Sequence, residues 1–306
     1  MKSQIALNQC HLYKCGSKNT LAERLQIDMK DLKAISEWAT YRTWDEEKPH
    51  GGTRTIYAPS EKLKKVQGRI KHLLERIERP SWIYSGMKGK CHVDNALAHQ
   101  GNGYYVLSDI SSFYENCTRD AVYKFFHETM LTAPDVAELL AEITTCKSIE
   151  GKQIIPVGSP CSQLLAYFSY REMFNELQSC AKSYGCMLTL YVDDLTVSSK
   201  TPISNPKSMT KQFAKIASAY GHSLKWSKTH YYGAGEFKVV TGVALDDEGK
   251  AFIPNTLGKN IKEGFERVLS GDKSEYASTK GRIGAARQIN ANAFPEIEKL
   301  IDQTIS

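Results

Sequence analysis

The 306-residue sequence lacks any apolar run of about 18 residues, so it predicts no transmembrane helix. Its N-terminus has no apolar stretch followed by small residues, and we therefore expect no signal peptide. The eight cysteines form no C-x-x-C pair, which argues against a structural zinc site. Because a secretion signal is also lacking, we expect reduced thiols and a cytoplasmic protein.

The composition is that of a globular protein, with 41% hydrophobic and 24% charged residues. These values exclude disorder as the main state, and the length suits one large domain or two to three packed subdomains. The net charge of +6 is a weak sign of a polyanionic partner. Basic residues gather between Lys62 and Lys90, where only Glu75 and Glu78 oppose them. This segment is either a solvated helix face or a groove that follows a phosphate backbone.

Helical and strand patterns alternate without a regular βαβ rhythm, which predicts an α+β fold with one antiparallel sheet backed by helices. The expected helices cover about residues 20–38 (broken near Asp28), 60–79, 120–130, 135–145, 163–182, 211–220, 256–269 and 274–305. The expected strands cover about residues 53–57, 104–109, 187–191, 195–198 and 237–245. The polar segment 42–48 precedes a turn at residues 49–52.

Three carboxylates stand where predicted strands end: Asp109 after one strand, and Asp193 and Asp194 in the turn of a hairpin. A single aspartate in such a place is usually a turn or cap residue. Adjacent acids between two apolar strands repel each other, however, and a divalent cation offsets this repulsion. With a third acid they would form a site for two Mg²⁺ ions about 3.5–4 Å apart. Such a site suits the attack of a hydroxyl on a phosphorus centre.

Several segments together resemble the motifs of reverse transcriptases. Tyr191–Leu195 (Tyr-Val-Asp-Asp-Leu) resembles motif C, and Leu107–Tyr114 resembles motif A. Ile155–Pro160 takes the place of motif B, and Ser227–Thr229 contains the lysine of motif D. Lys48–Ile56 is similar to the fingers motif that grips the triphosphate. Order and spacing agree over about residues 41–300.

The resemblance implies a right-hand polymerase with an antiparallel palm sheet, a helical thumb and RNA-directed DNA polymerase activity. It places the N-terminal helices and fingers at residues 1–100, the palm at 101–245 and the thumb at 246–306. A fingers insertion would cover about residues 120–155.

The family also implies roles for single residues. Asp109, Asp193 and Asp194 would bind the two Mg²⁺ ions, with help from the Ile110 carbonyl, although Asp194 could instead act on the primer side. Lys228 would be the general acid for pyrophosphate, and an aromatic ring at position 114 would exclude a 2′-hydroxyl. The expected nucleotide contacts are Lys48, Arg54, Tyr114, Val157 and Gly158. Solvated hairpin charges, a surface lysine, a core aromatic and a turn glycine are the plain alternatives.

Two elements point to the retron type: Asn95–His99 matches N-A-x-x-H, and Val240–Gly242 matches V-T-G. This type implies a structured non-coding RNA as template, priming at the 2′-hydroxyl of an internal guanosine and a branched RNA-linked single-stranded DNA. It also implies anti-phage defence with a separate effector protein. The expected RNA or primer contacts are Asn95, His99, Thr241, Gly242, Lys64, Lys65, Arg69, Arg282 and Arg287. A structural role for His99 is an equal alternative.

Motif B departs from the P-Q-G-x-P-S-S-P pattern of the family, because Val157 replaces the glutamine and Gln163 the last proline. Valine offers no amide, so we expect a change in nucleotide affinity or fidelity. Another bacterial reverse transcriptase, of abortive-infection or diversity-generating type, and an inactive RNA-binding scaffold are the alternatives. The two retron elements argue against the first, and the intact acids argue against the second.

Overall fold

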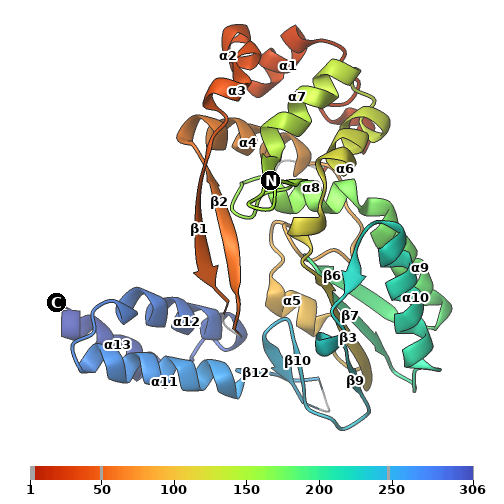
Figure 1. Cartoon of the computed structure of the whole chain (residues 1–306). Coiled ribbons are helices and arrows are strands. Elements are labelled where there is room, and N and C mark those ends of the chain that lie inside the picture. Colours follow the sequence, from red (N-terminus) through yellow and green to blue (C-terminus); the bar gives the residue numbers. More distant parts are fainter. Residues whose placement is uncertain (1–3, 49–50, 247–248, 306) are drawn as a thin grey trace. The chain divides into compact units, whose positions relative to one another are not determined.

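The computed structural model describes residues 4–48, 51–246 and 249–305 (Figure 1). Pro49 and His50, which belong to the predicted fingers motif and its turn, lie outside the described residues, as do residues 1–3. The chain divides into two compact units. Unit 1 contains Met1–Lys88, Ile110–Cys180 and Thr210–Lys225, and unit 2 contains Gly89–Asp109, Ala181–Met209 and Trp226–Ser306. Within the described ranges, we find no helix with the length and apolar character that crossing a bilayer requires.

Unit 1 begins with short helical segments where the sequence predicts two helices. They are η1 (Leu7–Gln9), α1 (Lys18–Leu25), α2 (Met29–Lys33) and α3 (Ile35–Trp38). The hydroxyl of Ser17 accepts the Thr20 N–H and caps α1, and α2 begins after Asp28, where the break is predicted. The amphipathic helix α4 (Glu61–Leu74) follows and buries an apolar stripe that includes Leu63, Val66 and Ile70.

Strands β1 (Tyr41–Glu47) and β2 (Thr53–Pro59) form a long antiparallel hairpin (Figure 1). The sequence predicts β2 but not β1. Most of β1 is exposed on both faces, so its residues do not alternate between polar and apolar. Strand β1 is recognised by its pairing with β2, and the periodicity of its sequence does not predict it.

The rest of unit 1 surrounds the predicted motif B. Its elements are η2 (Tyr114–Asn116), α6 (Arg119–Lys124), the π-helical turn η3 (Phe125–Thr129), α7 (Pro134–Thr144), β4 (Cys146–Lys147), β5 (Gln153–Ile154), α8 (Ser162–Ser169), α9 (Arg171–Ser183), α10 (Pro206–Ala219) and β8 (Ser223–Leu224). The predicted single helix over residues 163–182 is interrupted at Tyr170. Helices α9 and α10 continue from one unit into the other along the chain.

The main sheet of unit 2 contains β3 (Tyr104–Ser111), β6 (Met187–Tyr191), β7 (Asp194–Ser199) and β9 (His230–Tyr232). Strand β7 pairs antiparallel with β6 and with residues 104–109 of β3, and β9 also pairs with β3. The last two residues of β3 belong to unit 1, where they pair with β8. Alternate residues of the hairpin form a buried apolar face: Leu188, Leu190, Leu195 and Val197.

A second sheet in unit 2 contains β10 (Lys238–Val240), β11 (Val243–Leu245) and β12 (Ala251–Phe252). The predicted single strand over residues 237–245 is therefore two strands. Thr241 and Gly242 form the turn between them, with φ angles of +45° and +80°, as a type I′ turn requires. Val240 and Val243 pack with Val93 of helix α5 (His92–Leu97) and with Tyr105 of β3.

The C-terminal part of unit 2 is helical, with α11 (Asn255–Leu269), α12 (Glu275–Ile289) and α13 (Pro295–Ile305), and η4 (Trp226–Lys228) precedes β9. Ile261, Ile283 and Ile301 form its core. A Cβ atom at Gly264 would stand 2.2 Å from Thr279 Oγ1, so the approach of α11 to α12 requires glycine. Helices and antiparallel sheets together confirm the predicted α+β class, while the domain boundaries stay a prediction.

Candidate active site

The predicted carboxylates lie together in unit 2. Asp109 of β3 is the register partner of Asp194, the first residue of β7, and Asp193 occupies the β6–β7 turn. Val192 in the same turn has a φ of +62°, a left-handed conformation that is strained for a β-branched residue. The hairpin therefore brings the acid trio together through its register and a strained two-residue turn.

Burial and mutual repulsion make the ionised forms of Asp193 and Asp194 unfavourable. Burial, followed by the charges of Asp194 and Asp109, raises the pKa of Asp193 to about 7. Burial, followed by the charge of Asp109, raises the pKa of Asp194 to about 6. The positive charge of Lys228 opposes both shifts but does not cancel them. Full ionisation of the trio needs additional positive charge.

Lys228 acts as the counter-ion of Asp109 in this structure. Its Nζ donates a hydrogen bond to Asp109 Oδ2 at 2.6 Å. Burial alone would lower the pKa of Lys228, but the hydrogen bond and the charge of Asp109 outweigh it and raise that pKa. Its predicted role as general acid for pyrophosphate stays a prediction, because this geometry shows the lysine paired with a carboxylate.

The donor set suits a divalent cation, although it does not form a closed cage. Within the described part of the chain, no group of three or more His, Cys, Asp or Glu side chains is arranged to hold a metal ion. Carboxylate oxygens are nevertheless the ligands that Mg²⁺ prefers, and the raised pKa values of Asp193 and Asp194 show charge that such an ion would balance. Asp109, Asp194 and Lys228 line a cleft of about 290 Å³. Ile110 belongs to unit 1, where it pairs with Leu224, and its carbonyl stays a predicted ligand.

The predicted nucleotide contacts all lie in unit 1. Arg54 faces Glu46 across the β1–β2 hairpin, and its Nε donates to Glu46 Oε2 at 2.7 Å. Lys48 is exposed at the end of this hairpin. Tyr114 is half-buried in η2, with its ring 5.5 Å from that of Phe113. Lys48 and Arg54 therefore lie on an exposed hairpin, where an ion pair contributes little free energy.

Motif B packs against β2 and is hydrogen-bonded to it. The carbonyl of Val157 accepts the Tyr57 N–H at 2.8 Å, and Val157 lines a cavity of about 350 Å³. Gly158 has a φ of +109°, and a Cβ atom there would lie 3.1 Å from Ile56 Cγ2 and 3.2 Å from the Tyr57 carbonyl oxygen. Close packing against β2, in addition to the backbone conformation, thus requires glycine at position 158.

Asn95 and His99, two of the expected RNA contacts, have side chains that are 0% exposed in this structure, and their contact with RNA stays a prediction. His99 bonds to two hydroxyls, and Asn95 bonds to Thr241. The alternative of a satisfied structural histidine is the one that the geometry supports. Thr241 and Gly242 lie on the turn described above, and Thr241 lines the same cleft as Asp109.

Of the basic residues predicted to bind RNA, Lys64 and Lys65 are exposed on α4, whereas the three arginines serve the fold. Arg69 Nε donates to the carbonyl of Arg24 at 2.9 Å. Arg282 pairs with Glu275 at 3.2 Å, and Arg287 pairs with Glu298. The Arg282–Glu275 pair lies within α12, and the Arg287–Glu298 pair joins α12 to α13. The expected phosphate contacts of Arg282 and Arg287 would have to break these pairs.

Gln67 carries no role predicted from the sequence, yet this residue joins β1, α7 and motif B in unit 1. Its side chain is 0% exposed, and its Nε2 donates to the Tyr41 hydroxyl at 2.7 Å and to the Ile143 carbonyl at 2.8 Å. Its Oε1 accepts the hydroxyl of Ser159 in motif B at 2.7 Å. A glutamine on the apolar stripe of an amphipathic helix is the signal that could have revealed it.

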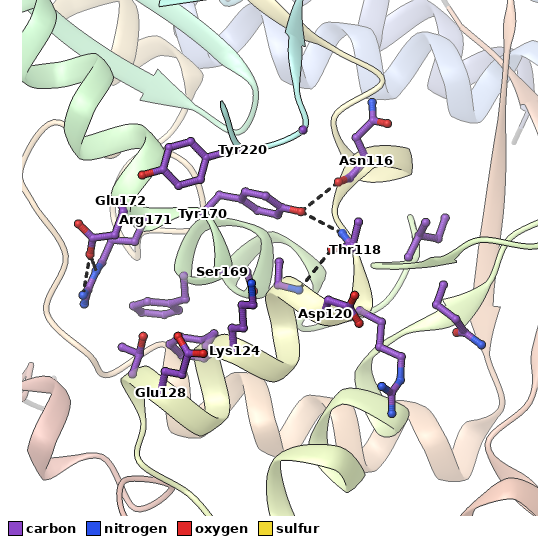
Figure 2. Close-up of a pocket in the computed structure, with 18 of the residues that line it drawn as sticks. Asn116, Thr118, Asp120, Lys124, Glu128, Ser169, Tyr170, Arg171, Glu172 and Tyr220 are labelled. Carbon is purple, nitrogen blue, oxygen red and sulfur yellow. Dashed lines mark hydrogen bonds and ion pairs between the residues drawn. The ribbon is translucent and has the colours of Figure 1, made fainter. Parts of the chain in front are cut away.

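A larger cavity of about 1100 Å³ lies in unit 1 (Figure 2). The Tyr170 hydroxyl points to Asn116 and Thr118, and it donates to the Asn116 carbonyl and accepts the Thr118 N–H, both at 3.0 Å. The charged lining residues are Arg119, Lys124, Lys152, Arg171, Glu115, Asp120, Glu128 and Glu172. Because the two signs balance, the cavity does not favour a polyanion, and it contains none of the predicted catalytic residues.

Comparison with known proteins identifies the family. The family model described as "Reverse transcriptase (RNA-dependent DNA polymerase)" matches residues 46–244. The chain is 26% identical to the retron Ec86 reverse transcriptase of Escherichia coli over 303 residues, which cover 96% of this chain and 92% of that protein. It is 31% identical to the retron Ec73 reverse transcriptase of the same species, with coverage of 86% and 88%. The match to the retron Se72 reverse transcriptase of Salmonella heidelberg is 29% identical and spans 57% of that protein.

Among solved structures, a telomerase of Candida albicans in complex with a TWJ fragment of telomeric RNA shares the fold. The TM-score is 0.50 at 12% identity, and the match covers 89% of this chain and 62% of that one. This likeness agrees with the predicted right-hand polymerase architecture. Together with the acid trio and the order of the motifs, these matches show that the chain belongs to the retron reverse transcriptases, a family of RNA-directed DNA polymerases.

Proposed function

We propose that this chain copies a structured non-coding RNA into DNA at the cleft lined by Asp109 and Asp194, with Asp193 in the adjoining β6–β7 turn. The observation that carries the proposal is the acid trio itself, in which two half-buried acids with raised pKa values stand beside the buried Asp109. Clustered carboxylates are costly for the fold unless they bind a cation. Two Mg²⁺ ions are the proposed cofactors. When bound, they supply a lowered pKa for the attacking hydroxyl and neutralise charge on pyrophosphate.

The protein's own residues would orient the nucleotide and the primer. Arg54 would exchange its exposed partner Glu46 for a phosphate, to which its planar guanidinium is suited. The half-buried ring of Tyr114 would exclude a ribose 2′-hydroxyl. Thr241 and Gly242, on the turn beside the cleft, would contact the primer strand. Lys228 would leave Asp109 and donate a proton to the departing pyrophosphate.

RNA binding would draw on exposed basic side chains and not on the buried polar ones. Lys64 and Lys65 lie on the exposed face of α4, and Lys259 and Lys262 lie on the exposed face of α11. Contacts of this kind release counterions, so affinity should fall as salt rises. Since the deep groove of RNA helices hides the bases, specificity would come from loops and helix geometry.

The retron type further implies priming at the 2′-hydroxyl of an internal guanosine, a branched RNA-linked DNA and a separate effector protein in anti-phage defence. The Asn95–His99 and Val240–Gly242 elements support this part of the proposal, as do the curated relatives that bear retron names. An RNA template and deoxynucleoside triphosphates follow from the family itself.

The experiment is to express the chain with its flanking genomic DNA, purify it and sequence the bound nucleic acid. The proposal predicts a DNA strand covalently joined to one RNA, and an enzyme that cleaves 2′–5′ branches should separate the two. Linear DNA joined through a 3′-hydroxyl would indicate another bacterial reverse transcriptase. RNA without any DNA would indicate an inactive scaffold and would overturn the proposal.

A further inference from the structure

His99 connects both strands of the hairpin that presents the acids. Its Nδ1 lies 2.6 Å from the Ser198 hydroxyl oxygen on β7, and its Nε2 lies 2.7 Å from the Thr189 hydroxyl oxygen on β6. Thr189 stands four residues before Asp193, and Ser198 stands four residues after Asp194. One imidazole therefore spans the two strands at equal distances along the chain from the acids at the tip.

The buried His99 ring is neutral and uses both of its nitrogens. Burial lowers the pKa of His99 to about 3, so the ring is neutral and has one donor and one acceptor nitrogen. Asn102 Nδ2 donates to the Ser198 hydroxyl at 2.7 Å. The neutral ring accepts a hydrogen bond from one of its two hydroxyl partners and donates one to the other. Both ring nitrogens are therefore paired in either tautomer, which fixes the ring and both strands.

Asn95, in the same Asn95–His99 sequence element, makes a second connection. Its Nδ2 donates to the Thr241 hydroxyl at 3.3 Å, and that hydroxyl donates to the His92 carbonyl at 2.8 Å. Thr241 adopts a left-handed φ of +45°, which is unfavourable for a β-branched residue unless its surroundings hold it. The two bonds to residues 92–95 supply that restraint, and they do so at the edge of the cleft that contains Asp109 and Asp194.

We propose that Asn95 and His99 are positioning residues that act on two different parts of one active site. His99 fixes the β6–β7 hairpin so that Asp193 and Asp194 stand against Asp109, and Asn95 fixes the Thr241–Gly242 turn against which the primer terminus would rest. The two sequence elements that mark the retron type would then be one structural unit. This inference rests on the proposed function, because it assigns the two residues to the metal and primer subsites of that reaction.

The test uses variants that remove one hydroxyl or amide group and keep the size of the side chain close to the original. Thr189→Val deletes one bond to His99, Ser198→Ala deletes the bonds of Ser198 to His99 and to Asn102, and Asn95→Leu deletes the bond to Thr241. Thr144→Val is the matched control, since the buried Thr144 makes one 2.6 Å bond to the Leu140 carbonyl in unit 1. Each full-length protein is compared by melting temperature, by Mn²⁺ affinity from electron paramagnetic resonance, and by kcat and KM on an RNA-templated primer.

We expect Thr189→Val and Ser198→Ala to weaken Mn²⁺ binding by about tenfold, as other residues that orient metal ligands do, with a parallel fall in kcat. Asn95→Leu should instead raise the KM for primer–template about tenfold and leave Mn²⁺ affinity within twofold. Thr144→Val should lower the melting temperature by as much as the other variants do, and it should leave the Mn²⁺ affinity, kcat and KM unchanged.

Unchanged Mn²⁺ affinity and kcat in both hairpin variants, with a lower melting temperature, would overturn the positioning role of His99. Asn95→Leu with an unchanged KM would overturn the role of Asn95. Asp193→Asn, measured alongside, separates these outcomes from a failure of the proposed function. If Asp193→Asn is inactive while the hairpin variants behave like Thr144→Val, only the positioning inference fails. If Asp193→Asn keeps both Mn²⁺ binding and extension, the proposed function itself fails.

Discussion

The two hairpins that contribute to the proposed reaction are built in opposite ways. The β6–β7 hairpin of unit 2 has one face of buried leucine and valine side chains and another face bonded to His99. The β1–β2 hairpin of unit 1 is largely exposed. Exposed cross-strand contacts hold it together, such as Arg54 with Glu46 and the Thr55 hydroxyl with Asp45.

This difference matches the tasks proposed for the two hairpins. Metal ligands need a fixed spacing, and burial with saturated hydrogen bonds provides it. A triphosphate must enter and leave, so its cations are better held by exposed pairs worth less than about 1 kcal/mol, which a phosphate can replace. The β6–β7 hairpin therefore provides stability and fixed positions for the acids. The β1–β2 hairpin provides cations that can exchange a glutamate for a phosphate.

Truncating a core side chain tests the difference in stability. Leu190→Ala should destabilise the protein by about 2–5 kcal/mol because it leaves a cavity beneath the acid-bearing hairpin. Trp44→Ala on the exposed hairpin should cost less than about 1 kcal/mol, although it removes a larger side chain. Urea unfolding of both variants measures the two costs. Equal losses would contradict the contrast between the hairpins.

Two buried histidines, one in each unit, differ in the hydrogen bonding of their rings. His222 packs on Phe113 and Tyr170 and, among the described residues, neither ring nitrogen has a hydrogen-bond partner, whereas both nitrogens of His99 are bonded. Burial lowers the pKa of His222 to about 4. Its neutral form is therefore stabilised above the unfolded pKa near 6.5, and this contribution is lost as the pH falls from about 6.5 towards 4.

His222→Phe should accordingly change the pH dependence of folding. At pH 5 the variant should be more stable than the wild type by about 2 kcal/mol, and near pH 8 the two should agree within about 1 kcal/mol. Melting temperatures across this pH range provide the measurement. A parallel offset at every pH would show that His222 does not titrate in this way.

Changes in the exposed hairpin should act on nucleotide binding alone. Arg54→Ala should raise the KM for nucleotide by about tenfold, the range expected for one charge-assisted hydrogen bond, with little change in stability. Glu46→Gln frees Arg54 from its partner, so its KM should fall or stay level. Steady-state incorporation kinetics distinguish the two variants. A rise in KM for Glu46→Gln would show that the ion pair itself holds Arg54 in its working position.

The smallest effect is expected at Val157, where the family pattern has glutamine. Val157→Gln should lower the nucleotide KM by up to about tenfold, or roughly 1 kcal/mol, if an amide contact is missing. Because the Val157 carbonyl already binds the Tyr57 N–H, the substitution leaves the backbone contact in place. A higher KM would indicate that the cavity beside Val157 has adapted to the smaller side chain.

Much of this arrangement could be predicted from the sequence, because its signals are local. The acids at the ends of apolar strands, the amphipathic α4 and the β6–β7 hairpin all follow from periodicity and turn chemistry. Strand β1 could not be predicted, since an exposed strand has no alternating pattern. Tyr170 interrupts a helix by reaching Asn116 and Thr118, far away in the sequence, so tertiary contacts override the helical pattern.

The partners of Asn95, His99, Arg282 and Arg287 lie elsewhere on the chain, and the sequence alone does not identify them. A histidine in a motif can face RNA or the core, and only the positions of Thr189 and Ser198 decide between them. An arginine in a basic helix can likewise pair with a phosphate or with a glutamate of the same bundle. Sequence resemblance predicts RNA contacts for these residues, and the structure shows a protein partner for each of them.

The central claim is that the acid trio catalyses RNA-templated DNA synthesis, and Asp193→Asn tests it most directly. The amide keeps the size of the side chain but removes the charge that would hold a metal ion, which supplies several kcal/mol of transition-state stabilisation. The account predicts that extension of a primer on an RNA template with Mg²⁺ falls at least about 100-fold, while the melting temperature without metal is maintained or raised. Extension at a near-normal rate by the folded variant would contradict it.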